Sequence, residues 1–149
     1  MEPAVPGAGR SAHLEPPVAS PIAEPTGYNS SVSAITTHVL DTSIGRPAAG
    51  LRVVLERRDK NSEWRILGHG ETDEDGRQRT LMGDHTPLEA GIYRLVFDTR
   101  AYFEARGTHT LFPSIIITFE VVEDGAQQAS RYHIPLLLGP FGYTTYRGS

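Results

Sequence analysis

Three residues of this chain could act on a substrate together: His38, His133 and Arg77. A histidine titrates near neutral pH, so two histidines on one surface could pass a proton to and from water. An arginine beside them could hold a planar, anionic substrate through its fork of donors. Each residue also has an ordinary interpretation, since strand histidines are usually structural and an arginine after Asp-Gly is usually a solvated turn residue. Residue chemistry alone therefore indicates a histidine-based site only as one option.

Other kinds of catalytic or metal site find little support in the sequence. The chain contains no cysteine, which excludes a disulfide, a thiolate nucleophile and a cysteine-ligated metal. The histidines show no metal-binding spacing such as H-E-x-x-H, and His38 and His133 lie too far apart in the chain to indicate zinc. No phosphate-binding glycine loop and no G-x-S-x-G nucleophile motif is present. We therefore expect neither a metal nor a cofactor.

Length and charge narrow the class of protein further. The chain has 149 residues and a formal net charge of −4, which suits one domain and gives no basic surface for nucleic acid. It has no apolar run of about 18 residues and no secretory signal, so we expect no membrane span and a cytoplasmic location. Residues 1–33 hold six of the eleven prolines among Ala, Ser and Gly, which predicts a disordered leader before a domain at 34–149.

The chemistry-bearing residues depend on strands that the sequence predicts. Residues 34–40 alternate and are rich in β-branched side chains, which predicts a strand with His38 opposite the apolar positions. Residues 131–138 predict a late strand that carries His133 between Tyr132 and Ile134, and an Asp-Gly turn comes just before Arg77. Further strands are expected at 51–57, 64–68, 91–97, 114–122 and 143–147.

One short helix interrupts these strands. Residues 99–106 lose the alternation, begin after a capping residue at Asp98 or Thr99, and end at Gly107. Seven or eight short strands with turn signals and a single helix indicate an all-β sandwich. The pattern by itself predicts neither an oligomer nor a reaction.

Four segments resemble sequences of the transthyretin family. Residues 35–48 (ITTHVLDTSIGRPA) resemble its first signature, and residues 141–149 (FGYTTYRGS) resemble its C-terminal signature. The tetrapeptide Tyr146-Arg147-Gly148-Ser149 resembles the one in the hydroxyisourate hydrolase branch, which the hormone-carrying branch lacks. Residues 72–77 and 131–138 resemble the arginine turn and the late histidine strand of the hydrolase branch. These matches run in order from about residue 34 to residue 149.

This resemblance implies a fold and an assembly. The transthyretin-like fold is a β-sandwich of two four-stranded sheets with one short helix. The family assembles as a homotetramer, a dimer of dimers, and the hydrolase branch has its active sites in the channel between dimers. That branch opens the cyclic amide of 5-hydroxyisourate to give 2-oxo-4-hydroxy-4-carboxy-5-ureidoimidazoline in urate (purine) degradation.

The resemblance also implies roles for particular residues. His38, His133 and Arg77 would be catalytic, with one histidine activating water and the arginine stabilising charge on the attacked carbonyl. Which histidine is the general base stays open. The substrate-binding residues would be His38, Arg77, Tyr146, Arg147 and Ser149.

The chain departs from the family pattern at three positions. Serine stands at position 114 in a Leu-Phe-Pro-Ser run, Gly139 takes the place of a common serine, and Arg131 replaces a common histidine. None removes a proposed catalytic group.

A transthyretin-like carrier of a hormone-type ligand, without catalysis, is the main alternative function, and the bulky polar tail argues against it. A non-catalytic adhesion or scaffold sandwich is the other, and it predicts no convergent histidines.

Overall fold

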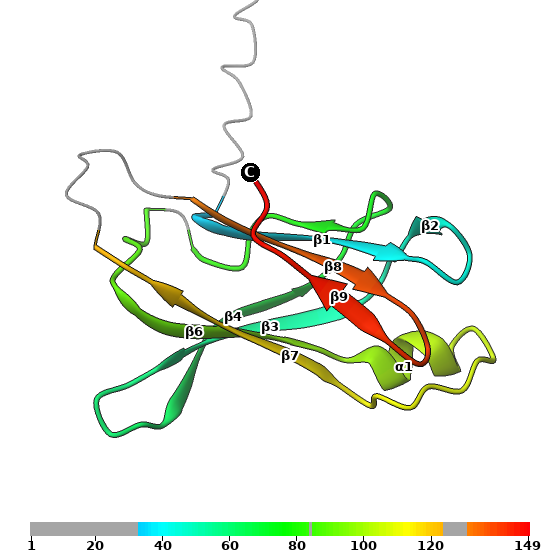
Figure 1. Cartoon of the computed structure of the whole chain (residues 1–149). Helices are drawn as coiled ribbons and strands as arrows, with labels where there is room; N and C mark the ends of the chain where they lie inside the picture. The colour runs from blue at the N-terminus through cyan, green and yellow to red at the C-terminus, as the bar shows by residue number, and fades with distance from the viewer. Residues whose placement is uncertain (1–32, 84, 124–130) are drawn as a thin grey trace, which may run out of the picture.

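The computed structural model describes residues 33–83, 85–123 and 131–149. Except for Ser33, the predicted leader lies outside the described residues. The elements follow in chain order (Figure 1): β1 Ile35–Asp41, β2 Arg46–Pro47, β3 Arg52–Arg58, β4 Trp64–Glu71, β5 Arg77–Gln78, β6 Gly91–Phe97, α1 Thr99–Glu104, β7 Ile115–Val121, β8 Tyr132–Leu138 and β9 Tyr143–Thr145.

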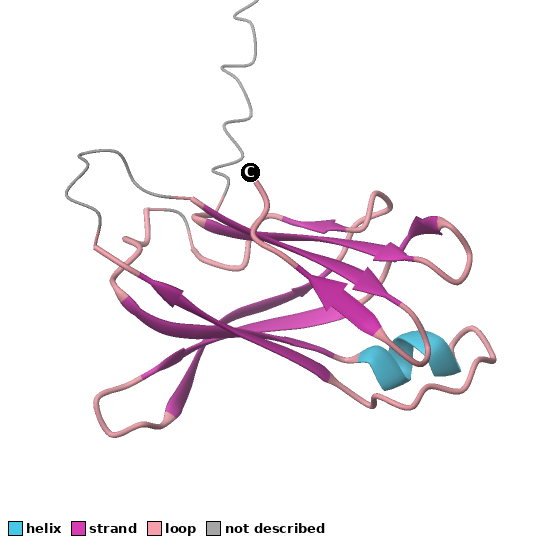
Figure 2. Ribbon diagram, in the orientation of Figure 1, coloured by secondary structure: helices cyan, strands magenta, loops and turns pink. Residues whose placement is uncertain are grey.

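The strands form two facing sheets with the helix at one end, which confirms the predicted sandwich (Figure 2). One sheet has the order β4-β3-β6-β7. The other has the order β2-β1-β8-β9, and β5 also pairs with β1. Because β8 occupies one edge of β1 along its whole length, β2 and β5 must share the other edge. Two short strands therefore act as one interrupted edge strand, and this sheet is also four strands wide.

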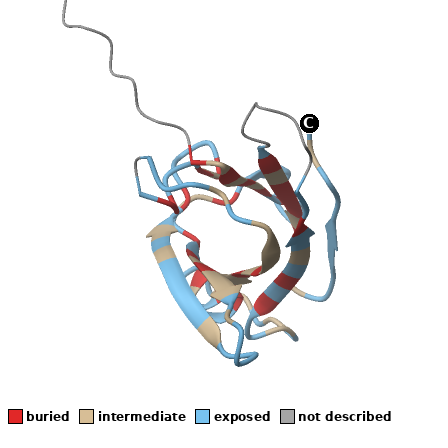
Figure 3. Cartoon of the chain, turned by 90° about the vertical axis from the view of Figure 1, so that its left-hand side faces the viewer, coloured by how far each residue is buried: buried red, intermediate tan, exposed pale blue. Residues whose placement is uncertain are grey.

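The core lies between the sheets and is supplied by strand alternation (Figure 3). In β3, Val53 and Leu55 are fully buried while their neighbours face outward. The helix closes one end with the buried side chains of Tyr102 and Phe103. Its predicted start is confirmed, since the Asp98 side chain accepts a hydrogen bond from the Ala101 amide. The helix ends at Glu104, before the predicted end at residue 106, and a turn continues to Gly107, which takes a left-handed φ of 65°.

The first and the last long strand lie side by side and parallel at the centre of one sheet. Ile35 pairs with Tyr132 and Thr36 with His133, and the register continues to the ends of β1 and β8. Pairing fixes side-chain direction, since alternate residues of a strand face opposite sides of a sheet. Residues from the two ends of the domain are thereby placed on one outer surface.

A buried polar contact joins this sheet to the helix. The carboxylate of Asp41, at the end of β1, is 1% exposed and accepts a hydrogen bond of 2.8 Å from the Tyr102 hydroxyl. Burial, together with the hydrogen bond to Asp41, raises the pKa of Tyr102 to about 12. The hydroxyl therefore remains a donor to the carboxylate across the physiological range.

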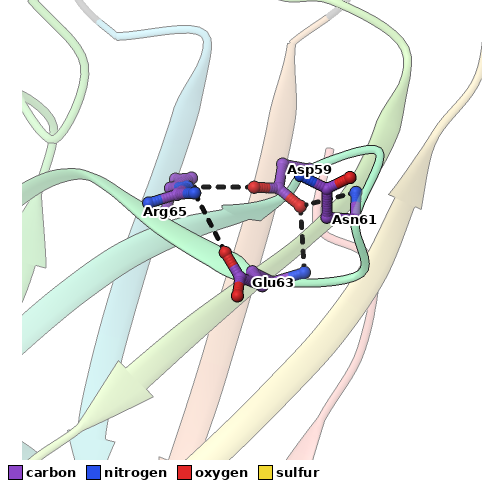
Figure 4. A network of polar contacts seen from close by, with 4 residues as sticks. All are labelled: Asp59, Asn61, Glu63 and Arg65. Carbon is purple, nitrogen blue, oxygen red and sulfur yellow. Dashed lines mark hydrogen bonds and ion pairs between the residues drawn. The ribbon is translucent and has the colours of Figure 1, made fainter.

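The hairpin between β3 and β4 is held by one carboxylate (Figure 4). Asp59 accepts hydrogen bonds from the backbone amides of Asn61 and Glu63 and from the guanidinium of Arg65. The Glu63 amide contributes most to lowering the pKa of Asp59.

In the described part of the chain, no helix is long and apolar enough to cross a membrane.

Candidate active site

The three predicted catalytic residues lie on the outer face of the sheet that contains β1, β5 and β8. Arg77 of β5 pairs directly with His38 of β1. His133 of β8 pairs with Thr36, which lies two residues before His38 on the same face of β1. The intervening positions, such as Thr37 and Ile134, face inward and are buried. Three neighbouring strands therefore present two imidazoles and a guanidinium on one surface.

A pocket of about 320 Å³ opens on this surface. It is lined by Ser33, Thr36, Thr37, Arg77, Arg79, Arg131, His133 and Ser149. His38 borders it from the same face without lining it. A larger cavity of about 410 Å³ lies at the β3–β4 hairpin, but it is lined by arginines, a lysine, Asp59 and Leu67 and contains no histidine. Acid–base chemistry near neutral pH therefore belongs to the outer-face pocket.

His133 has the surroundings of a general base. Its Nδ1 lies 2.8 Å from the hydroxyl of Thr36. Burial lowers the pKa of His133, and the nearby positive charges of Arg77 and His38 lower it further. The imidazole is therefore neutral at pH 7. When Nδ1–H donates to Thr36, the lone pair resides on Nε2, which is free to take a proton from water.

The hydrogen bonds of His38 differ from those of His133. Its Nε2 lies 2.8 Å from the backbone carbonyl of Asp75, and because a carbonyl can only accept, this nitrogen carries the proton and donates. Asp75 belongs to the turn that leads into Arg77. His38 therefore has only Nδ1 available for a substrate or a water, and its ring is fixed relative to the arginine turn.

That turn is built so that Arg77 reaches the surface. The carboxylate of Asp73 accepts hydrogen bonds from the amides of Asp75 and Arg77, both at 2.9 Å. Gly76 takes a left-handed φ of 76°, and a Cβ there would lie 2.2 Å from the carbonyl oxygen of Val39. Glycine is required because the turn packs directly against β1.

The tail after β9 crosses the site beside His133. The amide of Gly148 donates to the His133 carbonyl at 2.8 Å, and Ser149 lines the pocket. A Cβ on Gly148 would lie 2.4 Å from Cδ2 of His133, so the tail backbone rests against the imidazole. Because Gly148 faces outward and alternate residues face opposite sides, Arg147 faces the other side of the sheet.

Neither Arg147 nor Tyr146 is among the residues that line the outer-face pocket. The guanidinium of Arg147 lies 4.9 Å from the ring centre of Tyr132, a residue buried on the inner side. Arg147 and Tyr146 instead line a separate cavity of about 260 Å³ along β7. Of the five predicted substrate-binding residues, Arg77 and Ser149 line the pocket and His38 borders it. Substrate binding by Tyr146 and Arg147 stays a prediction, and in a single chain Arg147 instead holds the tail by stacking on Tyr132.

Several pocket residues were not predicted from the sequence. Arg79 lies two residues after Arg77, and Arg131 lies two residues before His133, so strand alternation alone could have indicated both. Ser33 corrects the predicted leader boundary, because it is buried and belongs to the fold. Its amide donates to the Arg79 carbonyl at 2.7 Å, and its hydroxyl accepts from the amide of Met82.

Comparisons with known proteins found a matching family model, related sequences and similar solved structures. The model of the HIUase/Transthyretin family matches residues 35–148. A 5-hydroxyisourate hydrolase from Salmonella dublin is 41% identical over 115 residues, which are 77% of this chain and 80% of that protein. The solved 5-hydroxyisourate hydrolase of Klebsiella pneumoniae superposes with a TM-score of 0.65 at 35% identity, covering 77% of this chain and 92% of that one. Sea bream transthyretin, solved with thyroxine, superposes with a TM-score of 0.69 at 28% identity, covering 78% and 95%.

Proposed function

The chain belongs to the HIUase/transthyretin family, and we propose that it hydrolyses 5-hydroxyisourate to 2-oxo-4-hydroxy-4-carboxy-5-ureidoimidazoline in urate degradation. The observation that carries the proposal is the convergence of His133, His38 and Arg77 from three strands on one pocket-bearing face. Relatives named for this reaction cover most of the domain. In the proposed reaction a histidine activates the water, so the step is written without a metal or cofactor.

In this mechanism, His133 is the general base. Its Nε2 takes a proton from water while Thr36 holds Nδ1, and the water oxygen attacks the C6 carbonyl of the ring. Arg77 stabilises the negative charge that develops on the carbonyl oxygen. The N1–C6 bond then breaks and N1 takes a proton from His133. C6 becomes a carboxylic acid on the same ring-opened molecule, and this acid ionises. His38 orients the substrate or the water through Nδ1, because its Nε2 is held by Asp75.

We further propose that the protein acts as a homotetramer in the cytoplasm. In one chain the pocket lies on an open outer face, and covering that face with a second subunit would lower its water content and strengthen the electrostatic contacts. Strands β7 and β9 each end a sheet and offer unpaired edges for subunit contacts. Light scattering coupled to gel filtration would give four chains per particle, and a monomer would contradict the proposal.

One assay tests the reaction. Purified protein is mixed with freshly generated 5-hydroxyisourate, and the ultraviolet decay is followed against buffer. We expect His133→Ala to slow turnover by about 10²–10⁴-fold, the usual contribution of acid–base catalysis, without unfolding the protein. His38→Ala should slow it by about 10²-fold through the loss of orientation. His69→Ala, on exposed β4, is the matched control and should keep the wild-type rate. Near-normal rates in both site variants would remove the mechanism.

The carrier function is the second candidate, because the fold also matches a transthyretin solved with thyroxine. The pocket here is lined by three arginines, a histidine and hydroxyl groups, which favours a polar substrate over an apolar ligand. A decay of 5-hydroxyisourate no faster than in buffer would favour the carrier or a non-catalytic scaffold.

A further inference from the structure

The pocket gathers more positive charge than the proposed reaction uses. Arg77, Arg79 and Arg131 all line it, and no aspartate or glutamate does. Within the part of the chain that the structure describes, the ion pairs of arginine involve only Arg52, Arg57, Arg65 and Arg94. Among the described residues, none of these three guanidiniums forms an ion pair with a carboxylate. Like charges repel one another, so their gathering here indicates an anionic ligand.

The three arginines occupy different levels of the pocket. Arg77 lies beside His38, next to the reacting groups. Arg79 follows two residues later, beyond the short pairing of β5 with β1, and its backbone carbonyl binds Ser33. Arg131 precedes β8 and is exposed, two residues before His133 on the same face. Arg79 and Arg131 therefore approach the pocket from the end where β1 and β8 begin, away from His38.

The proposed hydrolysis creates an anion that was not present before. Water adds its oxygen to C6, the N1–C6 bond breaks, N1 keeps one proton, and the new carboxylic acid releases the other to solvent. The product thus carries a carboxylate where the substrate had a ring carbonyl. Guanidinium is the side chain best suited to bind a carboxylate, because its parallel N–H groups match both oxygens.

We propose that Arg131 and Arg79 form a subsite that binds the carboxylate of the ring-opened product. This inference rests on the proposed function and deepens it, since it separates the arginine that faces the reacting carbonyl from those that receive the product. Arg79 and Arg131 both line the pocket, so the subsite carries two guanidiniums that stay charged at neutral pH. A permanently charged guanidinium does not lose its charge near pH 7, as an imidazole does.

Two stable probes that differ by one carboxylate test the subsite. Hydantoin and hydantoin-5-acetate share a five-membered cyclic amide, and only the second carries the acid arm. Each is titrated into the full chain, and binding is followed through the histidine ring protons by NMR. The variants are Arg131→Gln, Arg131→Lys and Arg100→Gln. Arg100→Gln is the control, since it removes the same single positive charge as Arg131→Gln but from an exposed arginine of α1.

We expect the wild-type protein to bind hydantoin-5-acetate about fivefold more tightly than hydantoin, a magnitude typical of a solvent-exposed charge contact. Arg131→Gln should abolish most of this preference, while Arg131→Lys keeps part of it and Arg100→Gln keeps all of it. Raising the salt concentration should reduce the preference of the wild type.

Two results would overturn the subsite: equal binding of both probes by the wild type, or an unchanged preference in Arg131→Gln. The 5-hydroxyisourate decay assay is run on the same samples to separate this inference from the proposed function. A wild-type protein that shows the carboxylate preference but no hydrolysis would overturn the assignment of the carboxylate to a product. A protein that hydrolyses 5-hydroxyisourate without the preference would retain the reaction and refute the subsite.

Discussion

The contact between Gly148 and His133 allows the geometry of the site to be tested without removing a catalytic group. In Gly148→Ala the new Cβ would start 2.4 Å from Cδ2 of His133 and 3.1 Å from Cγ of Pro135. Carbon atoms that are not bonded to each other settle at about 3.5–4.0 Å, so the two groups must separate by about 1 Å. Pro135 is a rigid, buried ring, which leaves the imidazole or the tail to move.

Either movement damages the site. If the imidazole moves, it loses its 2.8 Å contact with Thr36, and Nε2 no longer points where water is activated. If the tail moves, the hydrogen bond from the Gly148 amide to His133 breaks and Ser149 leaves the pocket. A displacement of about 1 Å in a catalytic group costs about 10²-fold in rate. We therefore expect turnover of 5-hydroxyisourate by Gly148→Ala to fall by about 10²-fold.

The fold should tolerate the same substitution, because the tail is largely exposed and loses about one hydrogen bond. That loss corresponds to about 1 kcal/mol, or a decrease in Tm of about 4 °C, measured by circular dichroism. Gly142→Ala is the matched control, since a Cβ at Gly142 meets nothing within 4 Å in the β8–β9 turn. Turnover by Gly148→Ala within about threefold of the wild type would refute the placement of the tail against His133.

Three further predictions concern the same framework. Because burial and Arg77 lower the pKa of His133, the acidic limb of kcat/KM should lie below pH 6.5, and Arg77→Gln should move it to higher pH in a stopped-flow pH profile. Thr36→Val removes the partner of Nδ1 and should reduce kcat about tenfold, with a decrease in Tm of no more than about 4 °C for the one lost hydrogen bond. Tyr102→Phe leaves the buried Asp41 short of a donor and should lower the free energy of unfolding by about 1–3 kcal/mol in urea, with turnover unchanged.

These predictions each have a contradicting result. A pH profile that Arg77→Gln leaves in place would mean that this guanidinium does not act on the titrating base. Full activity in Thr36→Val would show that the hydroxyl does not orient the imidazole. An unfolding free energy of Tyr102→Phe equal to that of the wild type would show that Asp41 is satisfied without the phenol.

The strands of the site could be predicted because their alternation is long enough to fix a face. His38 and His133 each lie within seven-residue strands, and their outward direction follows from the buried neighbours. The pairing of these strands could not be derived from alternation, since nothing local to either segment specifies a parallel neighbour so distant in the chain. The family resemblance implied only that the two histidines share one site, and the sandwich fold that it implied is confirmed. The parallel pairing itself comes from the structure.

The tail and the short edge strands lay beyond this reasoning. β5 has two residues, too few for any period, so the position of Arg77 opposite His38 depends on the turn that Gly76 permits. In the tail, Arg147 and Ser149 are two residues apart, so strand alternation would place them on the same face. The structure separates them, since Ser149 lines the pocket and Arg147 stacks on Tyr132. Arg79 and Arg131 carried a usable signal, the spacing of two from a site residue.

The central pairing of β1 with β8 has a consequence for biosynthesis. Thr36 and His133 are 97 residues apart, so the first strand leaves the ribosome long before its neighbour in the sheet exists. Until then one flank of β1 lacks its hydrogen-bonding partner, and His38 and Arg77 have no second imidazole beside them. Catalytic competence therefore arrives in a single late event, when β8 inserts next to β1, and translation that halts before this strand yields an inactive chain with an open strand edge that invites aggregation.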